Sequence, residues 1–147
     1  MPRAELCEPI ARVLQMLGVR RGMVVSGRVG DAHLDELSTL GENCIAEFYQ
    51  DRGFATSILP PDNFRSQPAA LADLAGGDSR ANAEIVRRLL TGEERGPKRD
   101  AILLNAGAAF FVAGKAKSLT EGSELAAETI ESGKAAAKLE ALAGISR

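Results

Sequence analysis

The order of two kinds of sequence pattern constrains this fold most. Short runs rich in β-branched and apolar residues come early in the chain and have the composition of strands: Gly22–Gly27, Cys44–Phe48 and Phe54–Leu59. The first run, closed by glycine, is typical of a buried strand that feeds a loop. The spacing between the second and third runs is compatible with a hairpin, and Pro60-Pro61 ends the third because proline cannot donate to a ladder.

Longer stretches with apolar residues at helical spacing make up much of the remaining chain. The predicted helices are Glu5–Leu17, a segment from Asp78 or Ser79 to Gly92, a long apolar segment that starts at Gly96-Pro97, and a last segment from Ser118 to Leu142. Gly18 follows the first helix, where a left-handed cap is expected. Ser118 and Glu121 have the spacing of a capping box, and Gly133 is expected to let the last helix approach a neighbouring element closely. Few strands and many helices indicate α/β layers, with a small sheet covered by helices.

Length and composition indicate one ordinary globular domain. The chain has 147 residues, of which 45% are hydrophobic and 26% charged, so we expect a single domain over residues 1–147. A net charge of -2 provides no broad positive field to attract nucleic acid or an anionic membrane. Neither is expected as a partner.

The sequence also predicts a cytoplasmic location. The N-terminus lacks the apolar core of a signal peptide, and the longest nearly apolar run, Ala101–Gly114, is shorter than the roughly 18 residues of a membrane span. Cys7 and Cys44 have no close-spaced metal pattern and lie among apolar neighbours, so we expect reduced thiols.

Asp35 and Glu36 are adjacent carboxylates that follow a predicted strand and a glycine-bearing loop. Because neighbouring side chains in an extended segment point apart, the two could hold separate Mg²⁺ ions, each completed by water and substrate phosphates. The other interpretation is a solvated acidic pair in a loop. The residues alone leave both open.

Other polar positions have a structural interpretation beside a functional one. We interpret Gly27–Gly30 as a turn rather than a phosphate loop, because it lacks the Walker and dinucleotide fingerprints. His33, the only histidine, is expected on a solvent-exposed loop. After Gly76-Gly77, Asp78 is expected to cap a helix, since its charge would oppose a phosphate.

Two further positions lie on the predicted apolar helix. Lys98 and Arg99 fall in its first turn, where positive charge opposes the helix dipole, so they either face an acidic partner or a phosphate or are simply solvated. Asn105 interrupts the apolar face and is expected to tie the helix to a neighbouring loop, because a buried amide needs hydrogen-bond partners. No residue is assigned a catalytic or substrate-binding role.

Several motifs, in a fixed order, resemble the C-terminal portion of the anthranilate phosphoribosyltransferases, a family of glycosyltransferases. They are Leu34–Ser38, Leu74–Asp78 with Asn82-Ala83, Gly96–Ala106, and the closing segments Val112–Ala116, Ser132–Ala135 and Lys138-Leu139. Together they extend over essentially the whole chain.

The resemblance implies a magnesium-dependent enzyme of tryptophan biosynthesis. That family transfers the phosphoribosyl group of phosphoribosyl pyrophosphate to the amine of anthranilate, and its Asp-Glu pair, here Asp35 and Glu36, binds Mg²⁺ around the pyrophosphate. Neutralising the leaving group is the main electrostatic need of such a displacement. The implied fold is a small, mostly parallel sheet covered by helices, the C-terminal α/β part of the enzyme without its N-terminal helical domain.

The chain departs from that family in length. The resemblance places the N-terminal helical domain, the Gly-Thr-Gly-Gly-Asp loop that cradles the pyrophosphate, and most anthranilate-binding residues in a half that is not among these 147 residues. Arg28–His33 also looks longer than the family's turn before Asp35. We therefore expect the isolated chain to be inactive. An alternative role is a non-catalytic binding or assembly module that needs a separate N-terminal partner or forms a homo-oligomer.

Overall fold

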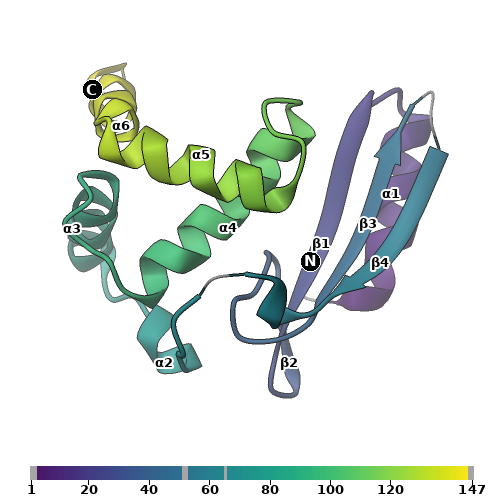
Figure 1. Ribbon diagram of the computed structural model, residues 1–147, viewed down its shortest axis with the longest axis horizontal. Helices are drawn as coiled ribbons and strands as arrows, with labels where there is room; N and C mark the ends of the chain where they lie inside the picture. The colour runs from purple at the N-terminus through teal and green to yellow at the C-terminus, as the bar shows by residue number, and fades with distance from the viewer. Residues whose placement is uncertain (1–2, 51–52, 65, 146–147) are drawn as a thin grey trace.

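The computed structural model describes residues 3–50, 53–64 and 66–145. A four-stranded sheet lies beside a group of helices, and one further helix covers the sheet from the other side (Figure 1). The strands, in the spatial order β2-β1-β3-β4, are β1 (Arg21–Val29), β2 (Ala32–Leu34), β3 (Asn43–Tyr49) and β4 (Gly53–Leu59). All three predicted strands are therefore confirmed, and β2 is an addition within the expected loop.

The expectation of a mostly parallel sheet is wrong, because each pair of neighbouring strands is antiparallel. The connections explain the direction. Only Gly30 and Asp31 lie between β1 and β2, and β4 follows β3 after a similarly short connection, whereas parallel neighbours need a crossover of about a dozen residues or more.

Six α-helices are described: α1 (Cys7–Met16), α2 (Leu71–Leu74), α3 (Ser79–Leu90), α4 (Pro97–Val112), α5 (Leu119–Glu131) and α6 (Lys134–Ile145). Short 3₁₀ turns, η1 (Ala4–Leu6) and η2 (Pro61–Asn63), precede α1 and follow β4. Gly18, with a φ of 87°, follows α1 as predicted. None of the helices in the described ranges is long and apolar enough to cross a membrane.

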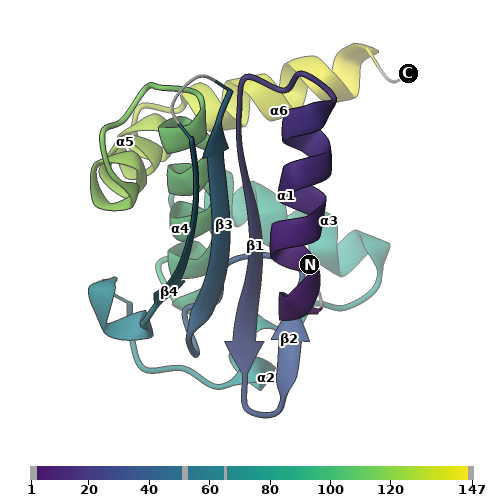
Figure 2. The same cartoon turned by 90° about the vertical axis from the view of Figure 1, so that its right-hand side faces the viewer.

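The two faces of the sheet contribute to separate apolar clusters. On one face, Ala11 of α1 packs with Val24 and Phe48. On the other, Leu104 of α4 packs with Ile45. Because side chains alternate along a strand, β1 and β3 supply residues to both clusters, and Figure 2 shows α1 and α4 on opposite sides of the strands. Burial on both faces accounts for the near-continuous apolar runs in the sequence.

The predicted last helix is in fact two helices, so its expected continuation to Leu142 is wrong. Gly133 lies between α5 and α6 with a φ of 74°, a left-handed conformation that ends a helix. The close approach expected of Gly133 is made instead by Gly107 of α4 and Gly122 of α5. A Cβ atom at Gly107 would lie 2.6 Å from the amide nitrogen of Ser123.

The predicted capping box at the start of α5 is present in modified form. Ser118 Oγ accepts from the amide of Glu121 at 3.1 Å. The carboxylate of Glu121 accepts at 2.8 Å from the amide of Lys117, one residue before the cap. Both side chains therefore satisfy backbone donors at this end of the helix.

Candidate functional site

Asp35 and Glu36 lie in the segment between β2 and β3. Both side chains are exposed, and neither makes a hydrogen bond or an ion pair with any residue in the described part of the chain. The next residues, Leu37, Ser38 and Thr39, are buried. The carboxylate pair thus stands at the exposed start of a segment that turns into the molecule.

Helix α4 holds the first buried residue of this segment through Asn105. Its Oδ1 accepts from the amide of Leu37 at 2.9 Å, and its Nδ2 donates to the carbonyl of Leu37, also at 2.9 Å. A third bond of 3.0 Å joins Nδ2 to the carbonyl of Ala101 within α4. The prediction that Asn105 ties the helix to a neighbouring loop is confirmed.

Strand β3 holds the second buried residue in the same way. The side chain of Asn43 is completely buried; its Oδ1 accepts from the amide of Ser38 at 2.6 Å, and its Nδ2 donates to the carbonyl of Ser38 at 3.0 Å. Nδ2 also donates to the carbonyl of Gly41 at 3.3 Å. Two asparagines therefore fix two successive residues after the carboxylate pair.

Strand β1 supports the segment by close backbone contact at Gly27. A Cβ atom there would lie 2.6 Å from the carbonyl oxygen of Glu36 and 2.5 Å from the amide nitrogen of Ser38. Real Cβ atoms do not approach backbone this closely, so the position requires glycine. The backbone that follows Asp35 is thus held by α4, β1 and β3.

A cavity of about 480 Å³ lies beside Glu36. Three of the sequence motifs contribute to it: Glu36 from the first, Gly76 and Asn82 from the second, and Lys98 and Asn105 from the third. Most of the remaining lining is aliphatic and comes from α3 and α4. Segments far apart in the sequence therefore meet at one place, although Asp35 itself is not among the lining residues.

The second motif forms a tight turn and a helix cap. Asp78 Oδ1 accepts from the amide of Ala81 at 2.8 Å and caps α3, as predicted. The amide of Gly77 donates to Asn82 Oδ1 at 2.8 Å, and Asn82 Nδ2 donates to the carbonyl of Gly77 at 3.0 Å. Asn82 thus repeats the arrangement of Asn43 and Asn105.

The two cations at the start of α4 have partners within the chain. Lys98 Nζ donates to the carbonyl of Asp73 at 2.6 Å. Arg99, with only 13% of its side chain exposed, forms an ion pair of 3.1 Å with Glu131 of α5. Arg99 was expected to face an acidic partner or a phosphate, or to be solvated. The structure gives it an acidic partner, Glu131.

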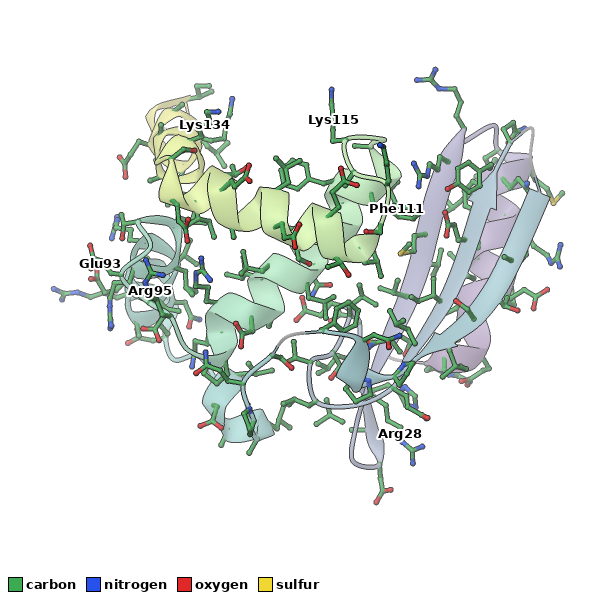
Figure 3. The ribbon with its side chains drawn as sticks, in the orientation of Figure 1. Arg28, Glu93, Arg95, Phe111, Lys115 and Lys134 are labelled. Atoms are coloured by element: carbon green, nitrogen blue, oxygen red, sulfur yellow. The ribbon has the colours of Figure 1, made fainter. Side chains whose placement is uncertain are left out.

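The expectation of a solvent-exposed loop histidine is wrong. His33 lies on β2, is half-buried, and places its Nδ1 3.1 Å from the hydroxyl of Ser26 on β1. The turn expected at Gly27–Gly30 is correct only at its end, because β1 continues to Val29 and Gly30 alone of the four lies in the turn. Arg28, labelled in Figure 3, donates from Nε to the carbonyl of Gly30 at 3.0 Å.

The donor atoms at Asp35 and Glu36 fit Mg²⁺ chemically. No group of three or more histidine, cysteine, aspartate or glutamate side chains that could hold a metal occurs among the residues with described positions. Mg²⁺ does not need such a cage, because it keeps several waters and binds through one or two carboxylates together with substrate phosphates. Exposed oxygen donors without protein partners suit that kind of site.

The roles of Asn43 and Asn82 were not predicted from the sequence. Each asparagine stands five residues after the residue that it holds, Ser38 and Gly77 respectively. Asparagine at that distance after a loop segment is a local signal that could have identified both. No comparable local signal exists for Asn105 and Leu37, which are 68 positions apart.

Comparison with known sequences shows that the chain is similar to proteins named anthranilate phosphoribosyltransferase, the family that the motifs resemble. The enzymes of that name from Geobacter sp. (strain M21) and Geobacter sulfurreducens are each 46% identical to it, over 97% and 95% of this chain respectively. The chain spans about 39% of the length of these curated relatives.

Solved structures agree with the sequence comparison. The crystal structure of anthranilate phosphoribosyltransferase from Thermus thermophilus has a TM-score of 0.79 and 44% identity, and a variant of the Saccharomyces cerevisiae enzyme with Mg bound has a TM-score of 0.79 and 27% identity. Each match covers 92% of this chain and 38% of the other. A family model described as the α/β domain of the glycosyl transferase family matches residues 1–136. The chain therefore belongs to this glycosyl transferase family.

Proposed function

We propose that this chain is the C-terminal part of an anthranilate phosphoribosyltransferase and that Asp35 and Glu36 are its Mg²⁺ ligands. The observation that carries the proposal is the pair itself: two exposed carboxylates without described protein partners, at the start of a segment fixed by Asn43 and Asn105. The names of the relatives support the reaction, and the Mg bound to the yeast enzyme supports the metal.

The proposed reaction displaces pyrophosphate from the anomeric carbon of phosphoribosyl pyrophosphate by the amine of anthranilate. When bound, Mg²⁺ supplies positive charge that stabilises the departing pyrophosphate. Asp35 and Glu36 would hold that charge at one edge of the site. Lys98, fixed by the carbonyl of Asp73, adds a second positive group to the cavity beside Glu36.

The proposal gives this chain one side of the site. Because it spans about 39% of its curated relatives, we infer that groups for the rest of phosphoribosyl pyrophosphate and for anthranilate come from the part that it does not span. Positioning both substrates contributes a large share of the rate of a two-substrate reaction. The isolated chain should therefore have little or no turnover. A cytoplasmic location is part of the same proposal.

A calorimetric titration of the chain with Mg²⁺ in the presence of pyrophosphate tests whether Asp35 and Glu36 bind the metal. Asp35→Ala and Glu36→Ala should each weaken binding by about tenfold or more, since each removes one of the anionic donors. Asp31→Ala is the matched control, because Asp31 is an exposed acidic residue in the neighbouring β1–β2 turn. Equal binding by all four proteins would remove the assignment.

A second candidate is a non-catalytic binding or assembly module. Large apolar side chains are exposed on α1 and α6: Met16 is 86% exposed and Ile145 is 85% exposed. Exposed apolar surface of this kind favours association with another chain. Light scattering would detect a homo-oligomer, and co-purification would detect a separate N-terminal partner. A monomer that binds Mg²⁺ with pyrophosphate would favour the enzyme over the module.

A further inference from the structure

The orientation of the carboxylate pair depends on the backbone that carries it. The side chains of Asp35 and Glu36 make no hydrogen bond or ion pair with any residue that the structure describes. Their side chains therefore take their starting direction from the backbone, which becomes fixed at Leu37. Whatever holds Leu37 also limits the directions in which the carboxylate of Glu36 can point.

The peptide unit between Glu36 and Leu37 is held at both of its edges. Its N–H, which belongs to Leu37, donates to Asn105 Oδ1 at 2.9 Å. Its carbonyl oxygen, which belongs to Glu36, lies against Gly27, where a Cβ atom would be 2.6 Å away. Because a peptide unit is planar, fixing both edges sets its orientation. The position of the Glu36 Cα atom is thereby set, which limits the directions in which its side chain can leave the backbone.

Asn105 is itself fixed in one orientation. Its two amide hydrogens are used by the carbonyls of Leu37 and Ala101, and its oxygen accepts from Leu37. Exchanging the oxygen and nitrogen by a rotation of the amide would place like groups together at Leu37. The residue also lines the cavity beside Glu36, so it connects the loop, the helix and the cavity.

We propose that Asn105 is a positioning residue of the Mg²⁺ site, which aligns Glu36 before the metal and pyrophosphate arrive. This inference rests on the proposed function of Asp35 and Glu36. Residues that orient metal ligands without touching the metal typically change metal affinity by about 10-fold to 100-fold when they are replaced. A residue that only stabilises the fold would change stability without that change in affinity.

The test is an NMR titration of the ¹⁵N-labelled chain with MgCl₂ in the presence of pyrophosphate. Asn105→Leu removes all three hydrogen bonds at similar side-chain size and should raise the Kd by about tenfold or more. Asn105→Gln keeps a neutral amide but lengthens the side chain by one methylene and so displaces its bonds to Leu37. Its Kd should lie between those of the wild type and Asn105→Leu. The relaxation of the Asp35 and Glu36 amides, measured without metal, should show increased motion in Asn105→Leu.

Ile130→Val is the control for stability. Ile130 is buried on α5 and does not line the cavity, so its replacement should lower stability and leave the Kd unchanged. If Asn105→Leu does not fold, the neutral variant Asn105→Gln decides. A folded Asn105 variant with the wild-type Kd would overturn the positioning role while leaving the Mg²⁺ ligands in place. Failure of the wild-type chain to bind would overturn the proposed function, and the positioning role with it.

Discussion

Asn105 and Leu37, 68 positions apart in the sequence, are joined by two hydrogen bonds of 2.9 Å that satisfy both backbone groups of Leu37. A side-chain amide can replace a strand neighbour in this way, because it offers one acceptor and a donor at the right separation. Asn43 does the same for Ser38. The loop that carries the candidate site is therefore ordered without belonging to the sheet.

Asn43→Ala should destabilise the chain by about 2–4 kcal/mol, because it leaves the buried amide and carbonyl of Ser38 without partners. Urea unfolding followed by circular dichroism measures the change. Asn82→Ala is the matched control. It removes two similar bonds to Gly77 at an exposed site, where water replaces them, so the loss should stay below about 1 kcal/mol. Equal losses would contradict the importance of burial at Asn43.

Gly107→Ala should destabilise the crossing of α4 and α5 by about 1–3 kcal/mol, since its methyl group would collide with the backbone of Ser123. Gly144→Ala makes the same change in α6, where nothing lies within 4 Å. Alanine is the better helix former there, so we expect no loss or a gain of up to about 0.5–1 kcal/mol. Thermal unfolding compares the two. The account of the crossing fails if Gly107→Ala is tolerated as well as Gly144→Ala.

Arg21→Lys should destabilise the contact between the sheet and the end of α4 by about 1 kcal/mol. The guanidinium of Arg21 lies 4.6 Å from the ring centre of Tyr49 and 4.1 Å from that of Phe111, which is labelled in Figure 3. A planar guanidinium can stack between two rings, whereas a compact ammonium cannot do so equally well. Arg20→Lys, at the exposed neighbouring position, is expected to be neutral in the same unfolding experiment. Similar losses for both variants would argue against the stacking.

The contribution of the buried Cys7 thiol to the stability of the chain should fall as the pH rises above 9. Burial, with a further contribution from the nearby Cys44, raises the pKa of the Cys7 thiol from its ordinary value of 9.0 to about 11. The unfolded chain therefore loses this proton first, so the contribution is complete below pH 9.0 and is lost progressively toward pH 11. The full contribution of Cys7 to the free energy of unfolding is roughly 2–3 kcal/mol, because each pKa unit of difference between the folded and unfolded chain corresponds to about 1.4 kcal/mol.

Cys7→Ala isolates that contribution, since the other groups that titrate in this range are retained. The difference in unfolding free energy between the wild type and Cys7→Ala should shrink between pH 9 and pH 11. A constant difference across that range would show that Cys7 does not titrate in the manner described.

Local sequence patterns predicted the elements well. The apolar periodicity predicted α1, α3 and α4, and the cap at Asp78 was predicted because it acts on its own helix end. The role of Asn105 was predicted because a buried amide needs hydrogen-bond partners. The strand positions were likewise predicted from local patterns. The motifs that carry the family resemblance also identified the cavity residues Glu36 and Lys98, although not that they meet.

The errors concern features that local patterns do not determine. Strand direction depends on how the connections are routed, and the parallel expectation ignored how short they are. Gly133 suits both close packing and a left-handed helix end, and only its φ of 74° distinguishes them. His33 pairs with Ser26 across a hairpin that was expected to be a loop. The roles of Asn43 and Asn82 were not predicted, although each lies only five residues after its backbone partner, a distance that a local pattern can reveal.

The central claim is that Asp35 and Glu36 form one side of a site, and that the part of the relatives that this chain does not span completes it. A complementation assay tests this claim most directly. The N-terminal remainder of the Geobacter sulfurreducens relative would be mixed with this chain, and anthranilate-dependent release of pyrophosphate from phosphoribosyl pyrophosphate would be measured with Mg²⁺. We expect little or no release from either part alone, release on mixing, and its loss when the chain carries Asp35→Ala or Glu36→Ala but not Asp31→Ala. Rapid turnover by the isolated chain, or undiminished release with both carboxylates replaced, would contradict the account.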